Sequence, residues 1–478
     1  MPAFRPTLER MKNDHPRARI IIAGGGIAGI TAARELDRLI RHRSDIEVLL
    51  VNRDNFFLLS PLLFEACSGV LELRHCAAPI RPSISRVRFM EGAIQRIDVE
   101  RRVVHVVGPS GAKIPLEYDH LIVALGATTN TKVIPGSEHA WTFKTVADAL
   151  LLRNHLIELL ERADVEPDAD RRRELLTVVV VGGGLVGVEL LGELTAFFDS
   201  ELRYYPRLRR RELRFHVFEI GNRLLPESTR FLGGYAERVL RERGAEIHTS
   251  TAVTAIEPGV VKWSEGAVCA ETIVLVPGIV PNVVASETAV ERDKRGRIVT
   301  ETTLRSVSHS TVWAIGDCAA IPGPDGKPYP ALAQHAVREA RAVARNVAAT
   351  ISGRAPKPFV FDALGSMAAF GRTRAAVDLR GLHFTGFIAW FIRRTYYLFQ
   401  MPRWERRLRI ALDWTVSLIC RPDLTKIDPA SEREQDRSRC AAGSVTSCSG
   451  VVRLSLAEPL GPVIQTASAA GEADALGA

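Results

Sequence analysis

Two glycine-rich turns, each lying between a run of branched apolar residues and a helical pattern, constrain this chain more than any other feature. The segment from Thr177 to Glu193 has four consecutive valines followed by Gly182, Gly184 and Gly187 in the spacing G-x-G-x-x-G. Such valine runs favour strands buried on both faces of a parallel sheet. In a strand–turn–helix unit the glycines make the turn, admit a pyrophosphate and let the helix pack on the strand. We expect the phosphates at the N-terminus of the following helix.

The same arrangement occurs near the start of the chain. There, Ile20–Ala23 precede Gly24, Gly26 and Gly29 at identical spacing. A single motif of this kind is weak evidence, because glycine turns also serve as plain connectors. Two copies, each between a strand and a helix, predict two nucleotide-binding units.

The residue that closes the second strand of each unit separates the two sites. In the dinucleotide fingerprint an acid at this place binds the ribose hydroxyls. Glu219 follows the strand Phe215–Phe218, and no arginine comes directly after it, which predicts a preference for NAD over NADP. Asn52 takes the equivalent place in the first unit, where an amide binds a hydroxyl without charge assistance. The alternative for Glu219 is a surface acid at a strand end.

Composition excludes several classes of protein. The chain has 478 residues, enough for two to three domains, with 46% apolar and 25% charged residues. No apolar run approaches the roughly 18 residues that cross a bilayer, and 1–19 lack a secretory signal. The seven cysteines are scattered without a C-x-x-C pair, which argues against a disulfide framework and a zinc site. A net charge of +8 without a recognition fold does not predict nucleic-acid binding.

Two later segments complete a set of motifs. The strand pattern 119–127 ends in Ala-Leu-Gly-Ala, and 310–319 contains Ala-Ile-Gly-Asp. In this order the four motifs resemble the two-dinucleotide-binding-domain flavoproteins. The resemblance implies an α/β fold with two Rossmann-like domains, in which an NAD-binding domain is inserted into a split FAD-binding domain. It also implies that Asp317 bonds the ribityl and pyrophosphate region of FAD.

The resulting domain prediction divides the chain into six parts. These are a flexible tail at 1–16, the first part of the FAD domain at 17–144, the NAD domain at 145–287, the second part of the FAD domain at 288–356, a β-rich and amphipathic helical region at 357–421, and a disordered tail at 422–478.

Over roughly residues 17–420 the chain is similar to the type II, single-subunit, non-proton-pumping NADH:quinone oxidoreductases. The carriers are Ser60-Pro61-Leu62-Leu63, Ala78-Pro79-Ile80-Arg81, 119–130, 182–189, Ala333-Gln334 and a basic, aromatic C-terminal segment. The resemblance implies that NADH passes a hydride to tightly held, non-covalent FAD and that two electrons then reach a membrane quinone of the respiratory chain.

The resemblance also implies the site residues. For FAD they are Gly24, Gly26, Gly29, Asn52, Pro61, Leu62, Ala124, Gly126, Asp317, Ala333 and Gln334; for NADH they are Gly182, Gly184, Gly187, Glu189, Glu219 and Gly278. Glu189 and Gln334 are the candidate catalytic residues, near the flavin ring and the quinone. Glu189 could orient the nicotinamide or help a proton reach the quinone. Its alternative role is that of an acid interacting with a helix N-terminus.

Two departures from the family bear on the acceptor. Arg338 stands where a second glutamine is usual, and Val276 and Pro277 precede Gly278 in place of an aromatic residue and alanine. A guanidinium there could stabilise anionic reduced flavin or change which acceptor fits. The alternatives are therefore a flavoprotein reductase with another acceptor, or a membrane-associated flavin sensor or scaffold with little turnover.

The segment 387–421 predicts membrane attachment. Seven arginines and two acids lie between Trp390 and Arg421, interleaved with aromatic residues. Such a stretch suits an interfacial helix pair, with rings at headgroup depth and arginines on anionic lipid. We therefore expect a peripheral protein on the cytoplasmic face of the cell membrane. The alternative is a helical hairpin that covers a core or a homodimer interface.

Overall fold

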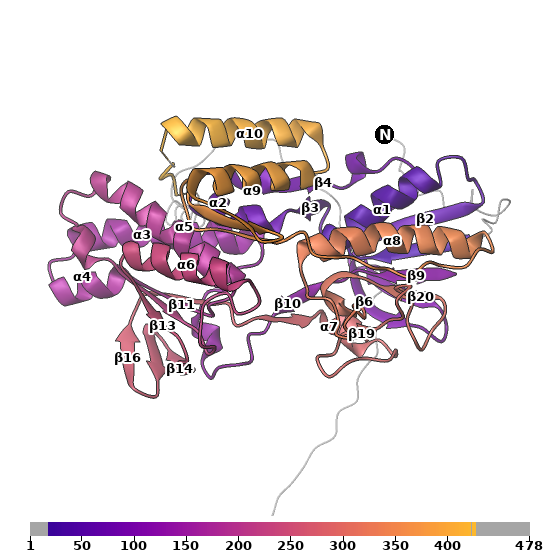
Figure 1. Ribbon diagram of the computed structural model, residues 1–478, viewed down its shortest axis with the longest axis horizontal. Coiled ribbons are helices and arrows are strands. Elements are labelled where there is room, and N and C mark those ends of the chain that lie inside the picture. The colour runs from indigo at the N-terminus through magenta and orange to yellow at the C-terminus, as the bar shows by residue number, and fades with distance from the viewer. Residues whose placement is uncertain (1–17, 422, 427–478) are drawn as a thin grey trace, which may run out of the picture. The chain divides into compact units, whose positions relative to one another are not determined.

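In the computed structural model, which describes residues 18–421 and 423–426, the two glycine turns follow strands of two separate parallel sheets. These residues all belong to one compact part of the chain. The tails predicted at 1–16 and 422–478 lie outside the described residues, apart from 423–426. The predicted α/β fold with two dinucleotide-binding sheets is confirmed (Figure 1). The boundaries between the predicted domains stay a prediction.

The first sheet has the strand order β20-β9-β1-β2-β5, with every pair parallel. Its strands are β1 (Ala18–Ala23), β2 (Ile46–Asn52), β5 (Arg88–Glu91), β9 (His120–Val123) and β20 (Val312–Ala314). Helix α1 (Ile27–Leu39) packs against α8 (Ala333–Ile351) beside this sheet (Figure 1). Because β20 comes almost 190 residues after β9 yet lies next to it, the first unit is built from two separate pieces of chain.

The second sheet is formed by the intervening residues, in the order β13-β12-β11-β17, again with every pair parallel. Its strands are β11 (Thr177–Val181), β12 (Arg214–Phe218), β13 (Ala245–His248) and β17 (Thr272–Leu275), with helices α3 (Val146–Val165), α5 (Leu185–Glu201) and α6 (Arg230–Glu242). All five residues of β11 are buried, as the valine run predicts. Helix α3 starts with a capping box, in which the Thr145 hydroxyl accepts from the N–H of Asp148 and the Asp148 carboxylate accepts from that of Thr145.

Smaller elements surround the two sheets. They are β3 (Phe56–Leu58), α2 (Leu63–Cys67), β4 (Ala77–Pro79), β6 (Ala93–Asp98), β7 (Val103–Val107), β8 (Lys113–Glu117), β10 (Ala127–Thr129), α4 (Ala169–Leu175), β14 (Val253–Glu257), β15 (Val260–Trp263), β16 (Gly266–Cys269), β18 (Ile279–Pro281), α7 (Val283–Glu287), β19 (Ile298–Val299) and β21 (Ala319–Ala320). The antiparallel pair β10–β18 joins the two parts of the molecule at the carboxyl ends of β9 and β17.

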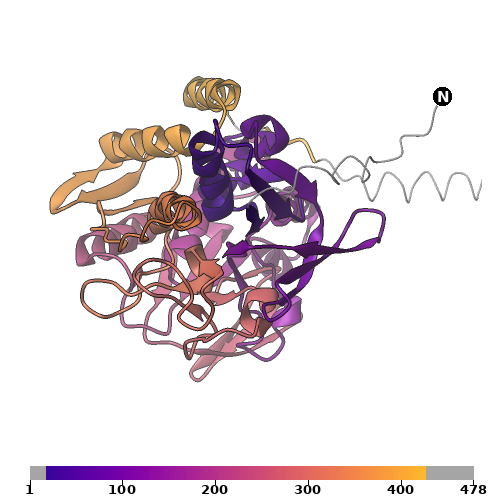
Figure 2. The ribbon, with the colours of Figure 1, turned by 90° about the vertical axis from the view of Figure 1, so that its right-hand side faces the viewer.

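The C-terminal region folds back over both units. A meander of β22 (Ser366–Ala369), β23 (Ala375–Leu379) and β24 (Leu382–Thr385) leads into α9 (Gly386–Gln400) and α10 (Trp404–Ile419). Figure 1 shows α9 above α2 and α5, and Figure 2 shows α10 end-on as the outermost of these helices. Within the described residues, no helix has the length and apolar character needed to cross a membrane.

Candidate active site

The first glycine turn connects β1 to α1 at the carboxyl edge of the first sheet. Gly24 has φ +105°, and a Cβ there would lie 2.4 Å from the carbonyl oxygen of Ala124. At Gly29 a Cβ would lie 1.7 Å from the carbonyl oxygen of Gly24, so only glycine lets the helix approach. At Gly26, in contrast, no described atom would lie within 4 Å of a Cβ. The space in front of α1 is therefore open to an anionic group that would face the N–H groups of its first turn.

The second turn, between β11 and α5, repeats this division of roles. Gly182 has φ +119°, and its Cβ would lie 2.3 Å from the carbonyl oxygen of Val276. A Cβ at Gly187 would lie 2.0 Å from the carbonyl oxygen of Gly182, whereas Gly184 faces open space among the described residues. Gly278, with φ +106°, also borders open space. The two turns are thus geometrically equivalent, and each has the form of a pyrophosphate cradle.

Glu219 closes β12 and braces the second turn. One carboxylate oxygen accepts from the N–H of Gly183 at 2.7 Å, and the other accepts from the N–H of Gly221 at 2.7 Å. The residue is 8% exposed. The structure therefore places the predicted acid directly beside the predicted cradle.

Asn52 has the same place at the end of β2. Its Oδ1 accepts from the N–H of Gly25 at 2.8 Å, and its Nδ2 donates to the carbonyl of Asp54 at 2.8 Å. Accepting from a turn N–H requires only a lone pair, so a neutral amide keeps the turn in shape. Compared with the acid that is usual at this place, Asn52 offers no negative charge to a ribose, as the sequence suggests.

Asp317 lies in a 3₁₀ turn, Gly316–Cys318, that follows β20. Ala124 and Gly126 follow β9, and because β9 and β20 are parallel neighbours, all three residues share one sheet edge with the first glycine turn. Burial raises the pKa of Asp317, and the ammonium group of Lys144 opposes this. The structure thus brings together the motifs predicted to hold one nucleotide, although they are far apart in the sequence.

A polar cavity opens beside Asp317. It is lined by residues that include Gly316, Asp317, Tyr329, Leu332, His335 and Glu339. His335 is 3% exposed, and its Nδ1 has no hydrogen-bond partner within the described part of the chain. Glu339 accepts from the N–H of Gly316 at 2.8 Å, and burial raises its pKa to about 7. A buried unpaired nitrogen costs free energy, so these residues fit a ligand with hydroxyl and phosphate groups, as FAD has.

Gln334 lies at the start of α8, one turn before Arg338. Its Nε2 donates to the carbonyl of Gly365 at 3.1 Å. The Arg338 guanidinium donates to the backbone carbonyl of Gln334 at 2.9 Å and lies 4.3 Å from the ring centre of Phe361. Arg338, which the sequence suggested as a partner for reduced flavin, is thus stacked on an aromatic ring, while Gln334 is tied to the loop before β22.

A second, more apolar cavity lies between α1, β3, α8 and α9. Its lining includes Ile27, Phe57, Leu59, Ala333, Val337 and Tyr397. It connects the start of α1 with α9, and the predicted Ala333 faces it. Its apolar lining suits an apolar acceptor.

Glu189, the acid singled out by its place in α5, is bound to the C-terminal region. It is 3% exposed, accepts from the N–H of Ala369 at 2.8 Å and forms an ion pair with Arg393 Nη2 at 2.9 Å. The same guanidinium donates to the carbonyl of Pro61 at 3.2 Å. Burial raises the pKa of Glu189, and Arg393 opposes this. The interaction with the helix dipole, the alternative role, is not what anchors this carboxylate.

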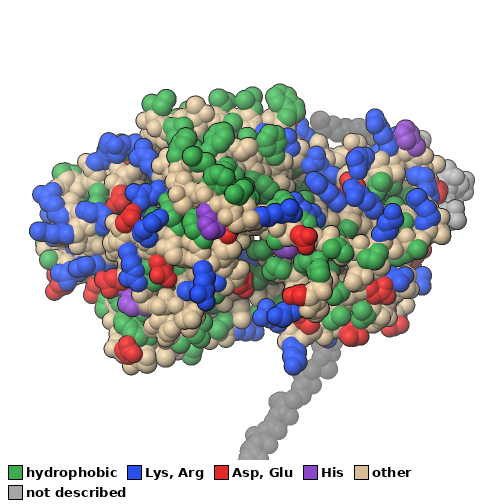
Figure 3. All heavy atoms as spheres, viewed as in Figure 1, with side chains coloured by type: hydrophobic (Ala, Val, Ile, Leu, Met, Phe, Trp, Pro, Cys, Tyr) green, Lys and Arg blue, Asp and Glu red, His purple; other side chains and the backbone are tan. Residues whose placement is uncertain are grey.

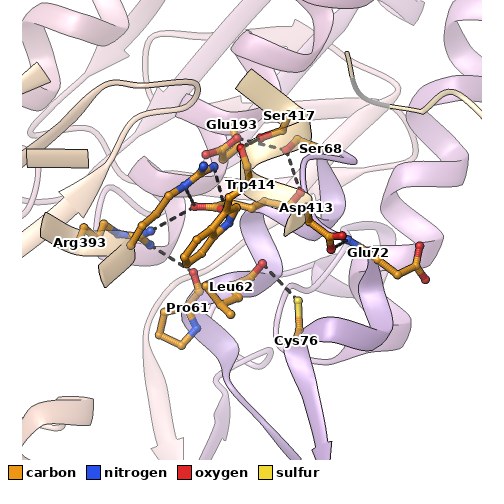
Figure 4. A network of polar contacts seen from close by, with 12 residues as sticks. Pro61, Leu62, Ser68, Glu72, Cys76, Glu193, Arg393, Asp413, Trp414 and Ser417 are labelled. Carbon is orange, nitrogen blue, oxygen red and sulfur yellow. Dashed lines mark hydrogen bonds and ion pairs between the residues drawn. The ribbon is translucent and has the colours of Figure 1, made fainter. Parts of the chain in front are cut away.

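Arg393 also belongs to a wider network of polar contacts, part of which is drawn in Figure 4. Glu65 in α2 forms ion pairs with Arg394 at 3.1 Å and Arg393 at 3.6 Å, and it accepts from the indole N–H of Trp414 at 2.5 Å. Glu193, one turn after Glu189, accepts from Ser68 at 3.2 Å, and its pKa is raised to about 7 by burial and by Glu65. Helices α2, α5, α9 and α10 are therefore joined by buried charges.

This network corrects one interpretation of the sequence. Arg393 and Arg394 were assigned to lipid, but they are 1% and 6% exposed and point inward. Trp390 and Trp414 are likewise buried. Helix α9 carries two adjacent arginines among apolar and aromatic residues, a pattern that does not show which of its faces is covered. Only the position of Glu65 and Glu189 next to this helix shows that the two arginines are buried.

Comparison with known proteins agrees with this geometry. The family model for pyridine nucleotide-disulphide oxidoreductases matches residues 18–340. The internal alternative NAD(P)H-ubiquinone oxidoreductase A1, mitochondrial, of Arabidopsis thaliana is 31% identical over 445 residues, with 86% of each protein covered. The type II NADH:quinone oxidoreductase Ndh of Mycobacterium tuberculosis is 29% identical, with 84% of this chain and 88% of that protein covered.

The chain belongs to the type II NADH:quinone oxidoreductases of the pyridine nucleotide-disulphide oxidoreductase family. A solved structure, NDH2 from Plasmodium falciparum in complex with NADH, matches this type II fold with a TM-score of 0.78 at 19% identity, covering 86% of this chain and all of that one. This membership confirms the predicted family and its cofactors, FAD and NADH, while the role of each residue stays a prediction.

Proposed function

We propose that this protein oxidises NADH and reduces a membrane quinone, with FAD in the first unit and NADH in the second, without pumping protons. The observation that supports this most strongly is the pair of equivalent glycine turns closed by different residues, Asn52 and Glu219. FAD, when bound, accepts a hydride from NADH and gives two electrons to the quinone.

The residues of the first unit would bind and orient FAD. The backbone N–H groups at Gly26 and the start of α1 would bind the pyrophosphate, and Gly24 and Gly29 let the turn and the helix pack closely. Asp317 and His335 line the polar cavity for the ribityl hydroxyls. Pro61, Leu62, Ala124, Gly126, Ala333 and Gln334 would also contribute to FAD binding. In the second unit, Gly182, Gly184, Gly187, Glu219 and Gly278 would bind NADH.

Glu189 would act at the meeting point of the two units. Its carboxylate is held by Arg393 of α9 and by the N–H of Ala369 of β22, and β22 packs against α5. Because Arg393 binds both Glu189 and the carbonyl of Pro61, it fixes the start of α5 relative to the turn at Pro61. We propose that this is how Glu189 orients the nicotinamide relative to the flavin ring.

The test uses the purified full-length protein. Its flavin absorbance is recorded, NADH is added without oxygen, and a short-chain quinone follows. We expect bleaching by NADH and recovery of the flavin spectrum on addition of quinone. A flavin that NADH does not bleach would refute the proposal, and a bleached flavin that quinone does not reoxidise would point to another acceptor.

Membrane attachment would use the outer faces of α9 and α10. Figure 3 shows apolar side chains gathered at the top of the molecule, where Figure 1 shows α9 and α10. They include Phe387, Ile388, Phe391, Trp404, Leu408, Leu412, Val416 and Ile419, each more than half exposed. Arg409 and Arg421 are exposed beside them and suit anionic headgroups. We propose peripheral attachment at the cytoplasmic face of the cell membrane, which would bring the quinone near the apolar cavity.

Substitutions test this better than deletion of the helices, because deletion would strip Glu65 and Glu189 of their partners. Leu408→Glu with Leu412→Glu should weaken flotation with anionic liposomes. Leu151→Glu is the matched control, since Leu151 on α3 is 51% exposed and Leu412 is 54% exposed. Unchanged flotation would contradict the assignment. A dimer that dissociates in the double variant would show that this face is instead a homodimer interface.

A further inference from the structure

Three potential metal ligands meet on β12 and β13, at the edge of the second sheet. Glu246 lies opposite His216 across the parallel pair β12–β13, and His248 lies two residues further along the same face. One ligand atom from each residue lies within 4.8 Å of those of the other two. Within the described residues, this is the one group of three or more histidines, cysteines and acids with such spacing.

The distances suit a shared ion. His216 Nδ1 and His248 Nε2 are 3.3 Å apart, and His216 Nδ1 is 3.6 Å from a carboxylate oxygen of Glu246. Two ligands that each lie about 2.05 Å from a tetrahedral ion are separated by roughly 3.3 Å. The two nitrogens therefore already have the separation that an ion requires. The Glu246 side chain is 54% exposed, so it can rotate and bring its carboxylate slightly closer to His216.

The surroundings hold both rings in place. His216 is 7% exposed. The His248 ring stacks on Phe218 with centroids 4.4 Å apart and planes 9° apart.

We propose that His216, Glu246 and His248 bind one divalent transition-metal ion, with Zn²⁺ as the best fit. Two imidazoles and a carboxylate are a known ligand set for zinc, with water in the fourth position. Glu246 would balance part of the ion's charge, and its exposed side chain would leave the site open to entry from solvent. The ion would link edge strand β13 to β12, because its ligands come from both strands.

The location gives this ion a consequence for the second nucleotide site. The N–H of Glu219 donates to the carbonyl of His248 at 2.9 Å. The strand end that presents Glu219 is therefore attached directly to a metal ligand. An ion that fixes His248 stabilises the frame of this site, whether or not the nucleotide is NADH.

The test uses full-length, FAD-loaded protein without an affinity tag, first stripped of metal with a chelator. Zn²⁺ is titrated in competition with a chromophoric chelator. We expect one tight equivalent, and a loss of more than about tenfold in affinity for His248→Gln and for Glu246→Gln. His309→Gln is the control, because His309 also contacts a carboxylate, Glu100, at 3.3 Å but has no third ligand among the described residues.

Two further measurements distinguish this site from others. Co²⁺ should give difference bands beyond the flavin absorption without a thiolate charge-transfer band, and Zn²⁺ should raise the unfolding temperature of the wild type and His309→Gln but not of His248→Gln. Zn²⁺ affinity equal in the wild type and in both ligand variants would overturn the proposal and leave a plain hydrogen bond between two imidazoles. Zinc binding that thiol alkylation abolishes would also overturn it, because Cys269 and Cys420 are exposed.

Discussion

The pair of Glu189 and Arg393 gives the sharpest prediction, because both residues are buried and belong to distant parts of the chain. We consider Arg393→Met, which keeps most of the side-chain volume but removes the charge. The substitution leaves the Glu189 carboxylate, 3% exposed, without the cation that lies 2.9 Å away. It also removes the donor to Pro61.

The expected loss of stability follows from this burial. Removing one partner of a buried ion pair costs about 3–5 kcal/mol, because the other charge stays desolvated. For a cooperative unit of about 400 residues, 4 kcal/mol lowers the unfolding midpoint by roughly 5 °C. The pKa of Glu189, already raised by burial, rises further without Arg393. A folded-state pKa above the unfolded value makes stability fall as pH rises, so the defect should be larger at pH 8 than at pH 5.

A double-mutant cycle measures this coupling by calorimetry. Glu189→Gln combined with Arg393→Met removes both charges and should recover most of the loss seen in Arg393→Met alone. Arg409→Met, at an exposed arginine of α10, is the control and should change stability by less than about 0.5 kcal/mol. If Arg393→Met is as stable as the control, or if the double variant is no better than the single one, the reasoning from the buried pair is refuted.

Three other predictions test the network and the two turns. The pKa of Glu193 is raised from 4.5 to about 7, so the stability of the wild type should fall by at most about 3 kcal/mol between pH 4.5 and 7. Glu193→Gln should remove this fall, which a pH series of melting curves measures. An unchanged dependence of stability on pH in the variant contradicts the prediction. Glu219→Gln should lower the ratio of kcat/KM for NADH over NADPH, and an unchanged ratio would mean that Glu219 does not face the ribose. Gly26→Ala should yield folded protein depleted of flavin, because a Cβ there meets only open space, whereas Gly29→Ala should prevent folding, because its Cβ would lie 1.7 Å from the carbonyl oxygen of Gly24. Absorbance at the flavin band and circular dichroism separate these two outcomes.

Much of the candidate site follows from local sequence. Glycine spacing, strand–helix alternation and the residue at each strand end are short-range features, and the structure places Asn52 and Glu219 at their turns as predicted. The C-terminal helices were also expected, yet their inward faces were not. Arg393 and Arg394 look like lipid contacts in sequence because nothing nearby in the chain shows which side of the helix is covered.

The sequence alone therefore determined the two glycine turns and the family, because these depend on patterns within a few dozen residues, and the same patterns predict which nucleotide each turn would hold. Only the tertiary structure decided that Glu189 is paired with Arg393 across roughly 200 residues of chain, that Arg338 is stacked on Phe361, and that His216 and His248 share one sheet edge. Those contacts depend on how strands pair and helices pack. No local period or motif encodes which distant side chain will lie opposite a buried charge.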